Sequence, residues 1–190
     1  MQPQHRLYFQ YRPTPTSQEQ LLQWQALASA ANPQARPVAP ERLHVTILHF
    51  GILADVYREL TEQQPPLSWD TYIQAAEQLF NEGQRHLPAT LSVAAEQFAL
   101  FGPQSGVLGV LCSQPPELVA AHRAVRSCLE SFLQACGIAH PRGFMQGSPN
   151  FRFAVELRPH ISLLRAARQV PDTSIQGHIL ELEAMPVHYR

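Results

Sequence analysis

Two short stretches of the sequence repeat one pattern, in which a histidine, an apolar residue and a hydroxyl residue lead into an apolar run. They are "LHVTIL" over 43–48 and "PHISLL" over 159–164. Successive side chains of a β-strand point to opposite faces, so His44 shares one face with Thr46 while their neighbours share the other. The pattern therefore predicts two strands, each with one apolar face to bury and one face that carries a histidine and a hydroxyl.

These polar faces suit the handling of a phosphate. Residues two apart on a strand lie roughly 6.5–7 Å from each other, so an imidazole and a hydroxyl there can contact one small anion. Histidine titrates near neutral pH, and two histidines that face one cleft can act as a complementary acid and base. Hydroxyls of Thr46 and Ser162 would hold nonbridging oxygens of the phosphate. The pattern thus favours phosphodiester cleavage by His44 and His160.

The remaining patterns predict an alternation of strands and helices along the chain. Strands are expected over 6–12, 43–50, 88–102, 106–112 and 159–164, and one or two closing strands over 174–190. Helices are expected over 18–31, capped by Ser17, over 70–84 and over 115–137. Turns are expected over 63–69 and 102–106, and an irregular stretch over 140–158. Each histidine strand follows a helix and an extended loop, which indicates two related halves.

Composition narrows the choice of ligand. The 190 residues are 45% hydrophobic and 15% charged, which fits one domain or two small lobes that share an interface. All 14 basic residues are arginine and the net charge is −1. This balance argues against binding of long duplex nucleic acid, which requires many neutralised phosphates. A nucleic-acid end, a nucleotide or another phosphorylated small molecule remains compatible, because arginine can bond two phosphate oxygens at once.

Other sequence features predict a soluble protein without a metal or a cofactor. We find no apolar run of membrane-spanning length and no signal peptide in the N-terminal residues, so we expect a cytoplasmic monomer. The three cysteines have no paired spacing, and we expect them to be small buried side chains. No "HExxH" or paired "CxxC" pattern occurs, so no metal site is predicted.

The two histidine motifs resemble those of a known superfamily. "RLHVTILHFG" and "LRPHISLLR" are similar to the paired histidine–x–threonine/serine motifs of the 2H phosphoesterases. Within that superfamily they look most like the bacterial RNA 2′,3′-cyclic phosphodiesterases, historically labelled 2′-5′ RNA ligases. The likeness extends to "RLYFQYRPTP" with the helix after it, and to the lead-in "RPVAPERLHVT".

The resemblance implies both a fold and a reaction. The fold is a bilobal α+β duplication with a pseudo-twofold axis, in which two largely antiparallel sheets face a central cleft and helices pack outside. Residues 1–190 would form a single bilobal domain. The reaction is metal-independent hydrolysis of 2′,3′-cyclic phosphates at RNA ends or on small nucleotides, sometimes with reversible 2′-5′ RNA ligation.

The resemblance also assigns roles to individual residues. His44 and His160 would be the acid and the base respectively, by analogy, although the residues themselves do not distinguish the two. Thr46 and Ser162 would bind the phosphate, and Arg165, which follows the second motif, could hold it as well.

The first motif departs from the family pattern at the fifth residue after its histidine. Family members commonly carry an aromatic residue there, whereas this chain has His49 followed by Phe50. In a regular strand, Phe50 would lie on the face of His44, where it could stack on a base or pack in the core. The same alternation turns His49 away, which predicts a structural role for it.

Alternatives to this function remain open. The cleft could bind a nucleotide or an RNA end without catalysis. It could also cleave a different cyclic or 2′-5′ nucleotide, such as an ADP-ribose cyclic phosphate or an oligoadenylate. A purely structural role for the histidines would predict neither a ligand nor a pH dependence.

Overall fold

The computed structural model describes residues 1–63, 67–102 and 106–185. The strands are β1 (Arg6–Pro13), β2 (Arg36–Pro37), β3 (Val45–Ile52), β4 (Thr90–Phe101), β5 (Val107–Cys112), β6 (His160–Arg165) and β7 (Ile179–Ala184). The helices are α1 (Pro15–Ala31), α2 (Leu53–Gln63), α3 (Trp69–Arg85), α4 (Pro116–Ala135) and α5 (Pro141–Gly147). Two short 3-10 helices are η1 (Pro40–Arg42) and η2 (Arg152–Ala154).

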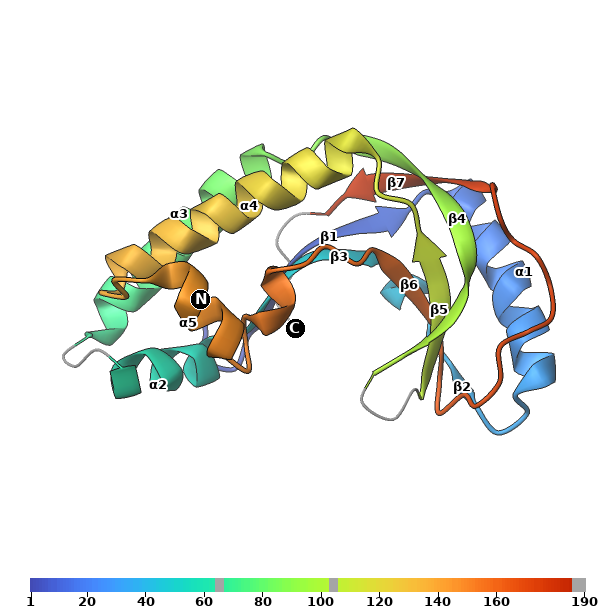
Figure 1. Cartoon of the computed structure of the whole chain (residues 1–190), viewed down its shortest axis with the longest axis horizontal. Coiled ribbons are helices and arrows are strands. Elements are labelled where there is room, and N and C mark those ends of the chain that lie inside the picture. Colours follow the sequence, from blue (N-terminus) through green and yellow to red (C-terminus); the bar gives the residue numbers. More distant parts are fainter. Residues whose placement is uncertain (64–66, 103–105, 186–190) are drawn as a thin grey trace.

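The strands form a seven-stranded sheet in the order β2-β6-β3-β1-β7-β4-β5, and β5 pairs in addition with β6. Every pairing that the structure describes is antiparallel. The predicted α+β class with antiparallel strands is confirmed. Where we expected two facing sheets, the two halves are joined into one strongly curved sheet, because β1 links β3 to β7 and β6 links β3 to β5 (Figure 1).

Helices cover the sheet from different sides. In Figure 1, α3 and α4 run side by side over one end of the molecule, and α1 lies beyond β4 and β5 at the other. Helix α4 packs on β3, while α1 packs on β6 and β7. Helix α3 begins where the Ser68 hydroxyl accepts a hydrogen bond from the Thr71 backbone N–H at 3.1 Å. Its buried residues Tyr72, Ala76 and Leu79 recur at helical spacing, so one face of α3 enters the core.

Several boundaries differ from the sequence prediction. Helix α1 begins at Pro15 after Thr14, and the expected cap, Ser17, is buried and accepts a hydrogen bond from the Glu181 backbone N–H at 2.8 Å instead. Helices α2 and α5 were not predicted. One closing strand, β7, is described. The predicted turns over 63–69 and 102–106, and the end of the closing segment, fall partly outside the described residues, at 64–66, 103–105 and 186–190.

Strand β3 is irregular at the third residue after its histidine. Its pairing with β1 runs from Phe9 opposite Leu48 to Gln10 opposite Thr46, so Ile47 is an extra residue. Such a β-bulge shifts the alternation of the side chains that follow it. Accordingly, Ile47 and Leu48 are consecutive residues that are both buried.

Strand β6 has the same irregularity at the same place in its motif. Its pairing with β5 runs from Leu108 opposite Leu164 to Gly109 opposite Ser162, which leaves Leu163 as the extra residue. A Cβ on Gly109 would lie 2.5 Å from a carbonyl oxygen of β6, so only glycine allows the strands to come this close. The two motifs are therefore alike in backbone shape as well as in sequence.

Candidate active site

The two motif strands lie next to each other, and they are antiparallel. Val45 of β3 pairs with Ile161 of β6, and both side chains are fully buried. Extending this register by one residue in each direction places the histidine of each motif opposite the hydroxyl residue of the other: His44 opposite Ser162, and Thr46 opposite His160. All four side chains are partly exposed on the face opposite to Val45 and Ile161. Their arrangement is a square with a pseudo-twofold axis through the buried pair.

The dimensions of this square suit one phosphate group. Directly opposed side chains in an antiparallel pair have Cβ atoms about 4.5–5.5 Å apart, and diagonal neighbours about 7–8 Å apart. His44 and His160 occupy one diagonal, and the two hydroxyl residues occupy the other. An anion above the centre of the square would be within reach of all four groups.

Both imidazole rings are oriented by the same kind of hydrogen bond. His44 Nδ1 lies 2.7 Å from the carbonyl oxygen of Arg42, and His160 Nδ1 lies 2.9 Å from that of Arg158. A carbonyl oxygen only accepts, so Nδ1–H is the donor in each case. In the neutral form of each ring the electron pair then lies on Nε2, so Nε2 is the atom through which the ring can accept a proton.

A cavity of about 650 Å³ opens beside the square. Thr46 and His160 line it together with Tyr8 of β1, Phe101 of β4 and Phe153 of η2. His44 and Ser162 are not among the lining residues, but the His44 ring centroid is 6.3 Å from that of Tyr8, which is. The structure thus brings the predicted histidines and hydroxyls together next to a cavity that could hold a nucleotide.

Arg165 lies further from this cavity. It is exposed at the end of β6, opposite Arg36 of β2 and Val107 of β5. The bulge at Leu163 restores Arg165 to the face of His160 and Ser162, so its long side chain extends from the polar side of the sheet.

Phe50 does not lie on the face of His44, so the expected face is wrong, whereas the alternative of core packing is confirmed. The bulge at Ile47 reverses the alternation, and a second register shift leaves Phe50 as an extra residue between the pairs Tyr8–His49 and Leu7–Gly51, where it is fully buried. Its ring meets Phe80, Phe132 and Phe151 edge-on, with centroids 5.3, 5.3 and 5.5 Å away. A residue enclosed by three other rings has no face left on which a base could stack.

His49 lines the cavity, whereas regular alternation predicted that it would face away from it. The same bulge turns its ring into the cavity lining, and its centroid lies 4.9 Å from that of Tyr8. Burial lowers the pKa of His49 from 6.5 to about 4, and the charge of Arg6 acts in the same direction. A hydrogen bond to the backbone of Asn150 opposes these effects only partly. His49 is consequently neutral at physiological pH.

Phe101 is a further contributor that the sequence reading missed. Its ring stacks on that of His160, with centroids 4.3 Å apart and an interplanar angle of 20°. The guanidinium carbon of Arg158 lies 5.3 Å from the centroid of the same Phe101 ring. Phe101 comes from β4, far from both motifs in sequence, so only the folded chain reveals that it holds the imidazole in place.

Helix α4 supports the opposite wall of the cavity. His122 Nε2 lies 3.1 Å from the carbonyl oxygen of Ala154, and Arg126 Nη1 donates to that of Val155 at 3.2 Å. Burial lowers the pKa of His122, the Ala154 bond counteracts this and the Arg126 charge adds to it. A neutral His122 that donates from Nε2–H fits the buried position, and it ties the cavity-lining segment to the helix.

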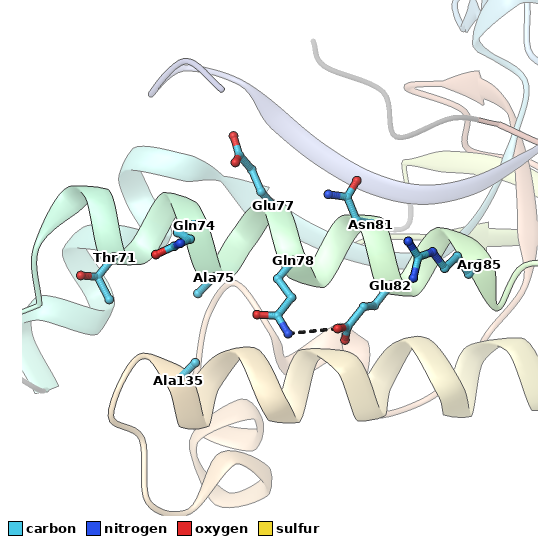
Figure 2. A pocket seen from close by; sticks show the side chains of 9 residues that line it. All are labelled: Thr71, Gln74, Ala75, Glu77, Gln78, Asn81, Glu82, Arg85 and Ala135. Atoms are coloured by element: carbon cyan, nitrogen blue, oxygen red, sulfur yellow. Dashed lines mark hydrogen bonds between the residues drawn. The ribbon is translucent and has the colours of Figure 1, made fainter.

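A second hollow, of about 550 Å³, lies between α3 and α4 (Figure 2). Its lining consists of α3 side chains such as Gln78 and Glu82, which share a hydrogen bond of 3.0 Å, with Ala135 of α4 across from them. The described residues that line this hollow include no histidine or cysteine, so it offers no imidazole or thiol for acid and base chemistry.

In the described part of the chain, no three histidine, cysteine or carboxylate side chains come together in an arrangement that could hold a metal ion. No described helix is long and apolar enough to cross a membrane.

The structure resembles solved phosphoesterases over nearly its whole length. A crystal structure of a phosphoesterase has a TM-score of 0.55 at 16% identity, over 97% of this chain and 98% of that one. E. coli LigT complexed with phosphate has a TM-score of 0.55 at 19% identity, over 98% and 93%. The protein TT0787 of Thermus thermophilus has a TM-score of 0.56 at 17% identity, over 97% of both chains.

At these identities the similarity is one of fold. No protein-family model matches the sequence, and no curated protein matches it by sequence. The chain has the fold of a LigT-like phosphoesterase, which agrees with the α+β class that the motif resemblance implied.

Proposed function

We propose that this protein is a phosphoesterase that hydrolyses 2′,3′-cyclic phosphodiesters at RNA ends or on small nucleotides, with His44 and His160 as acid and base and no metal. The observation that carries the proposal is the square of two histidines and two hydroxyls on adjacent strands. In both histidines Nδ1 donates to a backbone carbonyl, which sets the same tautomer, with the electron pair on Nε2, in both rings. A reaction that uses one proton donor and one proton acceptor requires two such rings in defined orientations.

The proposed reaction begins with a neutral imidazole and an imidazolium. Nε2 of the neutral ring removes a proton from a water molecule as its oxygen attacks phosphorus. Nε2–H of the charged ring donates a proton to the ribose oxygen as the P–O bond breaks. The hydroxyls of Thr46 and Ser162 donate to nonbridging oxygens, where negative charge increases in the transition state. By analogy, His160 is the base and His44 the acid. With a 5′-hydroxyl in place of water as the nucleophile, the same pair would form a 2′-5′ bond as the 3′-oxygen leaves, and this ligation would be reversible.

The size of the cavity and the ligands of fold neighbours support a nucleotide as the substrate. Structures of E. coli LigT have been solved with phosphate, with 3′-AMP and with ATP. A cavity of about 650 Å³ beside the square can hold a nucleoside whose phosphate lies between the histidines.

The test is hydrolysis of 2′,3′-cyclic AMP, and of a short RNA that ends in a cyclic phosphate, in excess chelator from about pH 5 to 9. Wild type is compared with His44→Ala and His160→Ala, and with His86→Ala as a control at an exposed histidine. We expect a bell-shaped rate profile in wild type and in the control. Loss of either predicted catalytic histidine should reduce kcat by roughly 10²–10⁴-fold without loss of folding.

Other outcomes identify the alternatives. Binding of 3′-AMP without any turnover would indicate a non-catalytic nucleotide-binding module. If the protein cleaves oligoadenylates or an ADP-ribose cyclic phosphate but not the RNA end, the proposed substrate is wrong and the proposed mechanism still holds. Activity that survives both histidine substitutions would refute the proposed acid and base pair.

A further inference from the structure

The two motifs have the same type of residue at each of the first five positions, beginning with the histidine. They differ in type at the fifth residue after the histidine. Because both strands have a bulge at the third residue, the fifth residue returns to the polar face in each. In the second motif this residue is Arg165, a permanent cation. In the first motif it is His49, whose ring lines the cavity. The equivalent positions of the two motifs therefore carry a cation, exposed at the end of β6, and a neutral heterocycle that lines the cavity.

The His49 ring has neighbours on two sides. The Tyr8 ring packs beside it with centroids 4.9 Å apart, and the Asn150 backbone interacts with the ring in the sense that raises its pKa. Asn150 is itself anchored, because its side-chain Nδ2 donates to Glu59 at 2.7 Å and its backbone N–H donates to Ser148 Oγ at 3.1 Å. Immobilised side chains of this kind lose little further entropy when a ligand binds.

The chemistry of the ring limits what it can recognise. The bond to Asn150 favours the charged ring, so the ring N–H donates and the carbonyl accepts. In the neutral ring the second nitrogen is then a hydrogen-bond acceptor. An acceptor without charge does not attract a phosphate, but it pairs with a hydroxyl or with an N–H group.

We infer that His49 recognises the nucleoside part of the substrate by accepting a hydrogen bond from a base N–H or, in a mononucleotide, from the 5′-hydroxyl, which is the one ribose hydroxyl that a 2′,3′-cyclic phosphate leaves unesterified. The inference rests on the proposed function, and it separates two tasks within one site. The histidine–hydroxyl square handles the phosphate, while His49 and Tyr8, on the β1–β3 wall of the cavity, select what is attached to it.

Two substitutions of His49 test this inference. His49→Phe keeps a ring of similar size against Tyr8 but removes the acceptor, and His49→Gln keeps an acceptor on a shorter planar group. His140→Gln, at an exposed histidine, is the matched control. Thermal unfolding of each variant verifies that it is folded. The substrates are the 2′,3′-cyclic phosphates of adenosine, of uridine and of ribose without a base.

We expect His49→Phe to raise KM by about 3- to 10-fold, the effect of one lost hydrogen bond, with kcat and the shape of the pH profile unchanged. His49→Gln should recover part of the loss. An equal rise with the baseless substrate identifies the 5′-hydroxyl as the donor, and a rise only with nucleotides identifies the base. An unchanged KM for all three substrates, or a loss confined to kcat, would overturn the inference.

Failure of the proposed function can be distinguished from failure of this inference. If wild type turns over none of these substrates, calorimetry with 3′-AMP and with inorganic phosphate replaces kinetics. Weaker binding of 3′-AMP by His49→Phe, with phosphate binding unchanged, would support nucleoside recognition in a non-catalytic site. Equal affinities of wild type and His49→Phe for 3′-AMP would exclude it.

Discussion

Replacing His49 by phenylalanine should make the stability of this protein less sensitive to acid. Burial lowers the pKa of His49 from 6.5 to about 4, the Arg6 charge adds to this and the Asn150 backbone bond opposes it. The unfolded chain therefore binds more protons than the folded chain between these two pH values. The contribution of a neutral His49 to the free energy of unfolding is complete above pH 6.5, and it is lost as the pH falls towards about 4.

The magnitude follows from the size of the pKa difference. Each unit is worth about 1.4 kcal/mol, so a shift from 6.5 to about 4 sets a limit of about 3 kcal/mol at strongly acidic pH. At about pH 5 only part of this limit has been reached, roughly 2 kcal/mol relative to neutral pH. The ring lines an open cavity, and solvent screening reduces the expected loss to about 1–2 kcal/mol.

The assay is urea unfolding of wild type, His49→Phe and the control His140→Gln, followed by the fluorescence of Trp24 and Trp69. Each protein is measured near pH 7 and near pH 5, and only the difference between the two pH values is compared. Carboxylates and His122 titrate in all three proteins, so their effects cancel in the comparison. The free energy of unfolding should fall by about 1–2 kcal/mol less in His49→Phe than in wild type. Equal losses in the two proteins would refute the buried, neutral His49.

Three other substitutions probe the frame around the site. Phe50→Ala should lower the free energy of unfolding by about 3–5 kcal/mol, measured with urea, because its ring is fully buried; a loss of ligand affinity without a loss of stability would contradict a core role. Phe101→Leu should reduce kcat by about 2- to 10-fold through misorientation of His160, while KM stays the same; an unchanged kcat would show that the stacking is dispensable. Gly109→Ala should cost at least about 1–3 kcal/mol and lower activity too, because its Cβ would meet the Ile161 carbonyl; a variant as stable as wild type would contradict this close approach.

Most of the longer elements could be predicted from hydrophobic spacing, and the two α-helices that were missed have different causes. Helix α2 carries Leu53, Val56 and Leu60 on one face, a helical spacing that a closer reading of 53–63 would have found. Helix α5 is seven residues long and contains two glycines, so its sequence does not favour a helix. It forms because Met145 is buried in the core and α5 packs on α4, which is a tertiary effect.

The composition of the site could be predicted only in part, because some of it depends on pairing between distant strands. The histidines and hydroxyls were found because their spacing of two is a local property of each strand. The pairing of Val45 with Ile161 brings the two histidines and the two hydroxyl residues together, and this pairing depends on the register between β3 and β6. Tyr8 and Phe101 reach the cavity from β1 and β4, whose positions follow from the order of the whole sheet.

The roles of Phe50 and His49 were exchanged because regular alternation was assumed through both motifs. Each motif, however, has two consecutive apolar residues after its hydroxyl, "IL" in the first and "LL" in the second. In a regular strand one residue of such a pair would be placed on the polar face, and burying both requires one extra residue. The pair is thus a sequence signal for a bulge, and it indicates that the fifth residue after each histidine belongs to the polar face. On this reasoning His49 and Arg165 are the positions at which the two halves of the site differ in charge, and hence where the recognition of the two ends of a substrate can diverge.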